Sequence, residues 1–182
     1  MRSFASEAID PVTLRVISKF DINLKPLTGG SENYNTVEIF FKTSFPNAWK
    51  DLNQNPQTPR KAMVQYLKWL NALQAESLWF VATPCSFDKS WINWYLKEFC
   101  LDKMTGPIKT PFDIHDFDIR SWECGLLGAD PSEADNLLYP SEWNSPLPHP
   151  HIARLDVAKA SDEIIRRLQW ANQRTKLYTQ IL

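Results

Sequence analysis

Alternating apolar and polar side chains dominate the first part of the chain. Residues 14–24 place an apolar side chain at nearly every second position, which is the period of a β-strand with one buried face. Residues 3–9 predict a second, shorter strand. Asp10-Pro11-Val12-Thr13 lies between the two and has the composition of a turn. The pattern therefore predicts a β-hairpin, which Pro26 and Gly29-Gly30 end.

Helical spacing follows the hairpin. Two short helices are predicted over residues 36–42 and 45–53. Thr58 and Pro59 have the properties of the N-cap and the first residue of a longer helix. The apolar side chains of this longer helix recur three and four residues apart, which predicts a buried stripe. The stripe comprises Met63, Tyr66, Leu67, Leu70 and Leu73.

Short strands and helices alternate further along the chain. Residues 78–82 are a continuous apolar run, which predicts a strand buried on both faces. Ile114 is expected at the end of another strand. Between them we expect a helix that is capped by Ser86 and carries an aromatic residue at every fourth position. These aromatic residues are Phe87, Trp91, Tyr95 and Phe99.

The last part of the chain consists of a helix, a long loop and a final helix. The first helix is predicted over residues 119–127, with Gly128 ending it. Residues 129–150 are rich in proline, aspartate, serine and asparagine, which predicts an irregular loop. A final helix is predicted from about residue 152 to the C-terminus. Together these elements predict a single α/β domain over residues 1–182, with a mixed sheet flanked by helices.

Composition and charge limit the classes of function. A formal net charge of −1 argues against binding of nucleic acid through bulk positive charge, although an enzyme can still bind a nucleic-acid end locally. The three cysteines lack metal-site spacing and indicate reduced thiols. No apolar run reaches the ~20 residues that span a bilayer, so we expect a cytoplasmic protein without a membrane partner. The 23 aromatic residues are interpreted mainly as core, with a base-stacking surface as the alternative.

Three residues carry the candidate chemistry. Asp88 follows the apolar run and is expected in the first turn of a helix, where the helix dipole favours an anion. Asp156 is expected near the start of the last helix, and His151 lies five residues earlier, where the loop enters it. An imidazole with an unperturbed pKa near about 6.5 suits a general base. Carboxylates suit Mg²⁺ or Mn²⁺, and two such ions can promote phosphodiester hydrolysis.

Each of these residues also has a purely structural interpretation. Asp88 can be a simple charge at a helix N-terminus, His151 a surface histidine, and Asp156 part of a solvated helix face. Their combination favours a functional site.

Other groups have weaker claims to chemistry. His115 lies among Asp113, Asp116 and Asp118, which is more typical of a strand end and a helix cap than of a metal site. No partner spacing supports Cys85 as a thiol nucleophile. Trp143 in the long loop is interpreted as a packed tether rather than a substrate contact.

Several segments of residues 20–182 resemble a bacterial or phage family of 3'-5' exonucleases. They are Asn23-Leu24-Lys25-Pro26-Leu27, Trp79-Phe80-Val81-Ala82, Phe87-Asp88 and Leu147-Pro148-His149-Pro150-His151. The chain is similar to the DEDD-type, histidine subclass, which has an RNase H-like fold. The resemblance implies that Asp88 is the second-motif aspartate, and that His151 and Asp156 form the third motif. It also implies a two-ion Mg²⁺ or Mn²⁺ site that uses Asp88 and Asp156, and a single-stranded DNA or RNA 3' end as substrate.

The chain departs from this family at its first motif. The family opens with a strand carrying Asp-x-Glu, whereas Glu7 and Asp10 have the wrong spacing to replace that pair. The hairpin's first strand then corresponds to the family's second. Met1 is accordingly expected to lie within a longer gene, or the chain is a natural remnant.

This departure sets the expectations for activity. We expect a metal-dependent exonuclease whose activity is weak or absent in the 182-residue chain. A sheet without its first strand leaves an open edge, which favours self-association. The alternatives are a non-catalytic nucleic-acid-binding or assembly module with the same fold, and an unrelated α/β domain.

Overall fold

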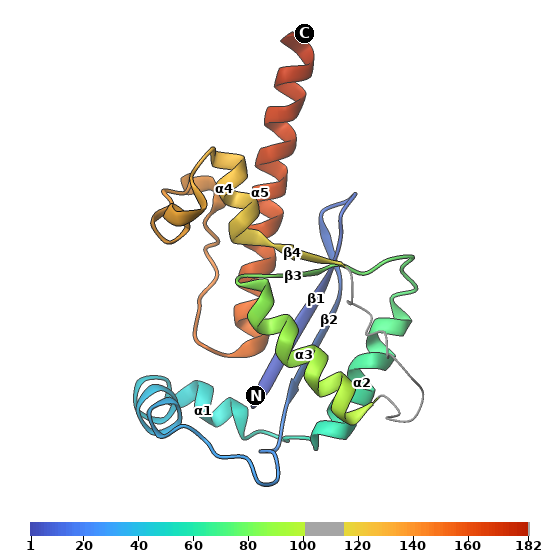
Figure 1. Cartoon of the computed structure of the whole chain (residues 1–182), viewed down its shortest axis with the longest axis vertical. Coiled ribbons are helices and arrows are strands. Elements are labelled where there is room, and N and C mark those ends of the chain that lie inside the picture. The colour runs from blue at the N-terminus through green and yellow to red at the C-terminus, as the bar shows by residue number, and fades with distance from the viewer. Residues whose placement is uncertain (101–114, 182) are drawn as a thin grey trace. The chain divides into compact units, whose positions relative to one another are not determined.

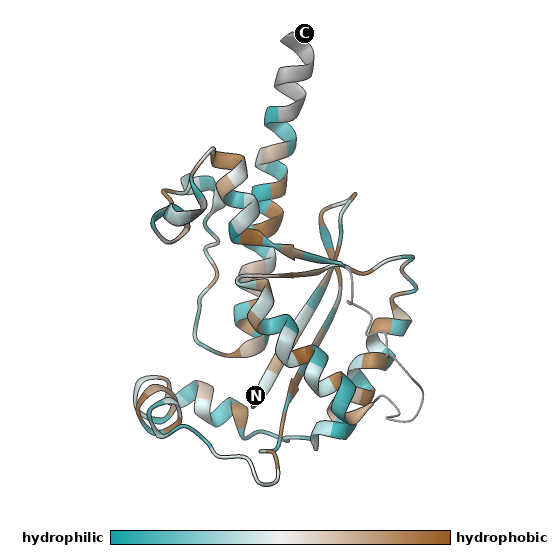
Figure 2. Ribbon diagram, viewed as in Figure 1, coloured by the Kyte–Doolittle hydropathy of each residue, from teal (hydrophilic) through white to brown (hydrophobic). Residues whose placement is uncertain are grey.

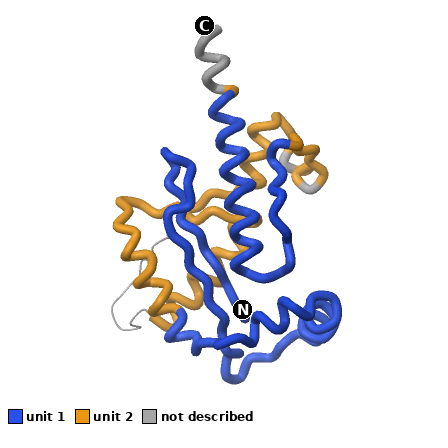
Figure 3. The backbone as a smooth tube through the Cα atoms, turned by 180° about the vertical axis from the view of Figure 1, so that it is seen from behind, with its two compact units in different colours: residues 1–62, 142–173 blue, residues 63–141, 174–182 orange. Residues whose placement is uncertain are grey.

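Two units, each assembled from separate stretches of sequence, make up the chain (Figure 3). The computed structural model describes residues 1–100 and 115–181. Unit 1 comprises residues 1–62 and 142–173, and unit 2 comprises residues 63–141 and 174–182. The chain mixes helices with short sheets, which confirms the predicted α/β class.

A β-hairpin opens unit 1, as predicted (Figure 1). Strands β1 (Ser3–Asp10) and β2 (Arg15–Asn23) pair antiparallel, with one register irregularity between Ala8 and Ile9. Glu7 faces Lys19 across the ladder, and their side chains form an ion pair with 2.7 Å between Oε1 and Nζ. Opposite charges that face each other across a ladder stabilise the pairing of the two strands.

The connection after the hairpin contains two helical segments, as predicted, but the first differs in type. Helix η1 (Asn35–Ser44) is a π-helix, and α1 (Pro46–Leu52) is an ordinary α-helix. The hydroxyls of Thr43 and Ser44 donate to the carbonyl oxygens five residues earlier, at 2.8 and 3.2 Å. These bonds fit the wider turn of a π-helix, which local apolar spacing does not reveal.

Helix α2 (Pro59–Ala72) begins where the sequence predicts. The Thr58 hydroxyl accepts a hydrogen bond from the Lys61 amide at 3.4 Å, and Pro59 occupies the first helical position. Three members of the predicted stripe are buried. They are Met63, Tyr66 and Leu70.

The strands of unit 2 are shorter and more exposed than predicted. Strands β3 (Phe80–Ala82) and β4 (Asp116–Asp118) pair in parallel. The predicted burial of β3 on both faces is wrong, because the Val81 side chain is 45% exposed. Ile114, expected at a strand end, lies outside the described residues. Among the described residues the strands form two separate two-stranded sheets rather than one mixed sheet, because no strand there bridges the two ladders.

Helix α3 (Cys85–Phe99) exists as predicted, but its cap and its buried face do not follow the prediction. Hydrophobic and hydrophilic residues intermix along it (Figure 2). Ser86 does not cap it; the Asp118 carboxylate accepts a hydrogen bond from the Cys85 amide at 2.8 Å. Phe87 and Trp91 are exposed, whereas the sequence predicts that the aromatic residues lie mainly in the core. Tyr95 of the aromatic row is buried, together with Cys85, Ile92 and Leu96.

Helix α4 (Ile119–Leu127) confirms both predicted ends. Asp118 is its N-cap and accepts hydrogen bonds from the amide and hydroxyl of Ser121, both at 2.8 Å. Gly128 ends the helix in the left-handed conformation, with φ of 67°. One carboxylate therefore organises the starts of both α3 and α4.

The predicted long loop contains only two short 3₁₀ turns, η2 (Pro131–Asn136) and η3 (Ser141–Trp143). The final helix, α5, spans Ala153–Ile181. Trp143 is fully buried and lies edge-on to Trp170 of α5, with 5.3 Å between ring centroids. This packing confirms Trp143 as a tether of the loop. None of the described helices has the length and apolar character needed to cross a membrane.

Removing the Asp118 carboxylate should destabilise the protein. Asp118→Ala is expected to lower the free energy of unfolding by about 1–2 kcal/mol, because two helix starts lose an acceptor. Urea unfolding followed by circular dichroism measures this. Asp116→Ala is the control: the largely exposed Asp116 carboxylate forms an ion pair with Lys89 at 3.0 Å, so its loss should cost at most about 1 kcal/mol. Equal losses in both variants would contradict the capping role.

The same carboxylate should give the protein a pH-dependent stability. Burial alone would raise the pKa of Asp118, but hydrogen bonds from Cys85 and Ser121 outweigh it and hold the pKa below its usual value. A carboxylate with a lowered pKa stabilises the fold above its unfolded value of about 3.9, and this stabilisation disappears as the pH falls through the folded value. The stability difference between the wild-type chain and Asp118→Ala should therefore shrink below about pH 4. An unchanged difference at acid pH would contradict this account.

Candidate functional site

The backbone before α5 reverses direction at His151. This residue adopts a φ of 59°, in the left-handed region that residues other than glycine rarely occupy. The amides of Leu155 and Asp156 then donate to the Ile152 carbonyl, at 2.8 and 2.9 Å, and begin the helix. Asp156 consequently lies in the first turn of α5, as predicted.

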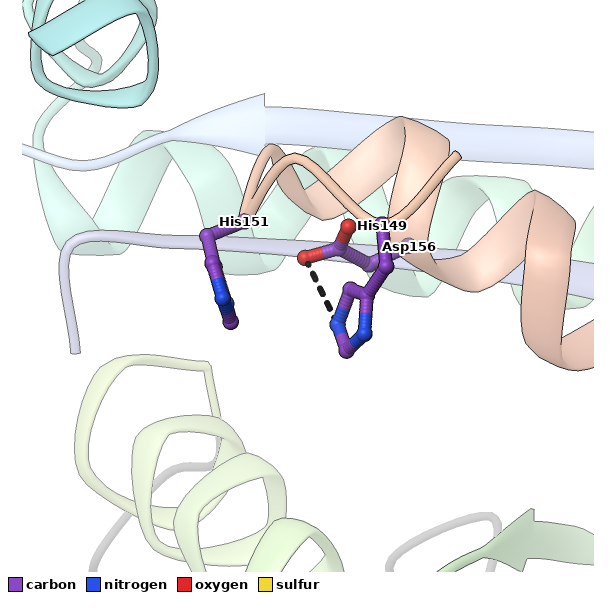
Figure 4. A group of neighbouring side chains, drawn as sticks. All are labelled: His149, His151 and Asp156. Carbon is purple, nitrogen blue, oxygen red and sulfur yellow. Dashed lines mark ion pairs between the residues drawn. The ribbon is translucent and has the colours of Figure 1, made fainter. Parts of the chain in front are cut away.

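Two histidines and one aspartate come together at this turn (Figure 4). His149 Nε2 lies 3.5 Å from Asp156 Oδ2, and the rings of His149 and His151 are 4.7 Å apart between centroids. One ligand atom from each residue lies within 4.8 Å of the other two. We call His149, His151 and Asp156 the α5 cluster.

Aromatic rings hold the His151 imidazole in place. Its ring centroid lies 4.1 Å from that of Phe45 and 4.9 Å from that of Phe40, in edge-to-face arrangements. The residue remains partly exposed and lies on the loop, which confirms its predicted position. The ring is therefore oriented by packing while solvent can still reach it.

The Asp156 carboxyl is incompletely satisfied. Its Oδ1 atom is buried and accepts no hydrogen bond from any residue that the structure describes. Burial raises the pKa of this carboxyl above its usual value, although His149, His151 and the nearby amides of His151 and Ile152 act to lower it. The fold thus keeps a carboxylate where its charged form is poorly compensated.

Contacts within unit 1 secure the start of α5. Arg154 forms an ion pair with Asp51 at the end of α1. The Arg167 guanidinium lies over the buried Trp143 ring, 5.7 Å from its centroid. These contacts hold in place the loop and the helix that carry the α5 cluster.

Asp88 lies in the first turn of α3, which confirms its predicted local position. The residue is exposed, yet partial desolvation of its carboxyl raises the pKa above the usual value. Asp88 belongs to unit 2, whereas His151 and Asp156 belong to unit 1. The convergence of Asp88 with the other two on shared ions stays a prediction.

Other potential sites of unit 2 have structural roles. Cys85 is buried, and burial raises the pKa of its thiol, which opposes a role as a nucleophile. His115 stacks on Trp79 with 5.3 Å between ring centroids, and Asp118 serves as a helix cap. Asp113 lies outside the described residues.

Sequence reasoning missed His149 as a member of the site. The sequence feature that could have indicated this role is the His149-Pro150-His151 segment, in which two histidines flank a proline. Because the proline keeps the segment out of a helix, both rings can turn toward the same side.

The donor set of the α5 cluster differs from that expected for two Mg²⁺ ions. A pair of hard ions needs several carboxylate oxygens, whereas the cluster offers one carboxylate and two imidazoles. These three residues do not by themselves fit the two-ion Mg²⁺ or Mn²⁺ site that the resemblance implies.

Comparison of the chain with protein-family models gave no match, and comparison with curated proteins also gave none.

Neutralising Asp156 should not destabilise the protein in the absence of divalent ions. A carboxyl whose folded pKa is raised favours folding at low pH, and its contribution falls as the pH rises from about 3.9 through the folded value. At pH 7 Asp156→Asn should therefore be at least as stable as the wild-type chain. Urea unfolding in EDTA at pH 7 measures the difference.

Asp162→Asn on the same helix is the matched control. Although burial alone would raise it, the pKa of Asp162 is lowered by Ser145 and by Arg166, whose Nε lies 2.7 Å from Oδ2. Its neutralisation should reduce stability at pH 7. A clear loss of stability in Asp156→Asn, matching that of Asp162→Asn, would show that Asp156 serves the fold rather than a site.

Proposed function

We propose that the chain is a metal-dependent 3'-5' exonuclease domain with an RNase H-like fold, acting on a 3' end of single-stranded DNA or RNA. One observation carries the proposal. His151 and Asp156, which match the third motif of that family, meet at the start of α5 with the imidazole partly exposed.

His151 is the proposed general base. A neutral imidazole can accept the proton of the water that attacks the phosphodiester. Packing against Phe40 and Phe45 limits the orientations of the ring, which favours one direction of proton transfer. His151 also adopts a strained left-handed backbone conformation, and such strain occurs often at functional sites.

Asp88 and Asp156 are the proposed ligands of the Mg²⁺ or Mn²⁺ ions. Bound ions would neutralise the phosphate and activate the water. Two aspartates supply too little anionic oxygen for two ions. We therefore propose that the 182-residue chain is a weak nuclease and that an Asp-x-Glu strand completes the site.

Exposed aromatic side chains on α3 support binding of single strands. Trp91 and Trp94 are 42% and 45% exposed, and Phe87 is 61% exposed. Positions 87, 91 and 94 are four and three residues apart, so they lie on one side of the helix. Bases stack on such rings without bulk positive charge, which suits a net charge of −1. The same observation favours the second candidate, a non-catalytic nucleic-acid-binding module.

The proposal also covers the cellular compartment of the protein and its self-association. Cys85, Cys100 and Cys124 are free thiols, which suits the reducing cytoplasm. Among the described residues β1 pairs only with β2, so its other edge can pair with a second copy of the chain.

Nuclease activity should depend on the third-motif residues. With Mn²⁺, a chain extended before Ser3 by an apolar strand carrying Asp-x-Glu should shorten a 5'-labelled single strand from its 3' end much faster than the 182-residue chain. In the extended chain His151→Ala should lower the rate by about 10²–10⁴-fold, because the general base is lost. Asp88→Asn and Asp156→Asn should abolish activity, whereas His115→Ala should not change it.

The outcomes distinguish the two candidate functions. Single-strand binding that weakens in Trp91→Ala, without degradation by any folded form, would support the binding module and overturn the exonuclease. Equal rates in the His151→Ala and wild-type extended chains would also overturn the exonuclease.

A further inference from the structure

We propose that the α5 cluster binds one divalent ion of the borderline class, typified by Zn²⁺, through His149, His151 and Asp156. The proposal goes beyond the exonuclease function and does not depend on it, because it concerns a different ion and a different set of ligands. Imidazole nitrogen and carboxylate oxygen are the donors that Zn²⁺ takes in proteins, whereas Mg²⁺ prefers oxygen alone.

The spacing of the donors suits a single ion. Zn²⁺ lies about 2.0–2.2 Å from nitrogen and oxygen ligands, so tetrahedral ligand atoms are about 3.3–3.6 Å apart. His149 Nε2 and Asp156 Oδ2 are already 3.5 Å apart, and all three donor atoms lie within 4.8 Å. Rotation of exposed side chains can close the remaining difference. The His149 side chain is 56% exposed and is free to make that adjustment.

A second observation points to a cation at the same place. Among the described residues no hydrogen bond of good geometry reaches the buried Oδ1 atom of Asp156, although the amides of His151 and Ile152 lie near the carboxyl. A buried carboxylate oxygen without a donor costs free energy that a bound cation offsets. The His149 contact reaches only the other oxygen. The charge of the Asp156 carboxylate is therefore only partly compensated by the fold, and an ion bound beside Oδ2 and His149 would compensate it further.

The surroundings fix two of the three ligands before any ion binds. Phe40 and Phe45 restrict the His151 ring, and the first turn of α5 fixes Asp156. Preorganised ligands lose little conformational freedom when they bind. Three protein ligands also leave a fourth position for water or for an oxygen atom of a substrate. Because His151 and Asp156 are shared with the proposed nuclease site, bound Zn²⁺ would block that site.

Titration of Zn²⁺ into the EDTA-treated, dialysed chain tests the site. Calorimetry should show one ion per chain. His149→Ala, His151→Ala and Asp156→Asn should each weaken binding by about tenfold or more, because each removes one of three ligands. His115→Ala is the control, since it removes the third histidine of the chain and should leave the affinity unchanged. Circular dichroism verifies that each variant is folded.

Spectroscopy separates this site from binding to the free thiols. In the imidazole NMR spectrum Zn²⁺ should shift the His149 and His151 signals and leave those of His115 unchanged. Co²⁺ should give visible absorption without a thiolate charge-transfer band. Unchanged affinity in the three cluster variants, thiolate absorption, or no saturable binding would overturn the proposal. Binding of Zn²⁺ through the cluster by a chain without nuclease activity would still support the proposed Zn²⁺ site.

Discussion

The reversal of the backbone at His151 is the constraint on which the site depends. A φ of 59° turns the proline-rich loop into α5 within two residues, so that His149 and His151 lie close to Asp156 in the first turn of the helix. A residue with an extended backbone there would direct the loop elsewhere and separate the imidazoles from Asp156. The ion pair of Arg154 with Asp51 and the burial of Trp143 hold this turn in place.

Two aspartates at helix starts show how the fold and the candidate site differ. Asp118 receives hydrogen bonds from Cys85 and Ser121, and its pKa is lowered. Asp156 occupies a comparable position on α5, yet Oδ1 lacks a donor among the described residues and its pKa is raised. A carboxylate that stabilises its helix is normally satisfied as Asp118 is. The fold therefore compensates the charge of Asp118 more fully than that of Asp156, a difference that supports the proposed ligand role of Asp156.

Local sequence patterns predicted the elements that depend on neighbouring residues. The hairpin, the cap at Thr58 and the stop at Gly128 follow from contacts within a few residues, as does the position of His151. The cap of α3 could not be predicted, because its acceptor Asp118 lies 33 residues away. The division of the strands into two sheets depends on which strands pair, and the role of His149 depends on a turn of the backbone. The spacing of apolar residues predicts neither of these.

The central claim is that His149, His151 and Asp156 form one ligand-binding site. Crystals of the chain grown with Zn²⁺, with diffraction recorded on both sides of the zinc absorption edge, test it most directly. We predict an anomalous peak within about 2.2 Å of a nitrogen of each imidazole and of an Asp156 oxygen. A peak coordinated by the cysteines or by His115, or no peak at the start of α5, would contradict the claim.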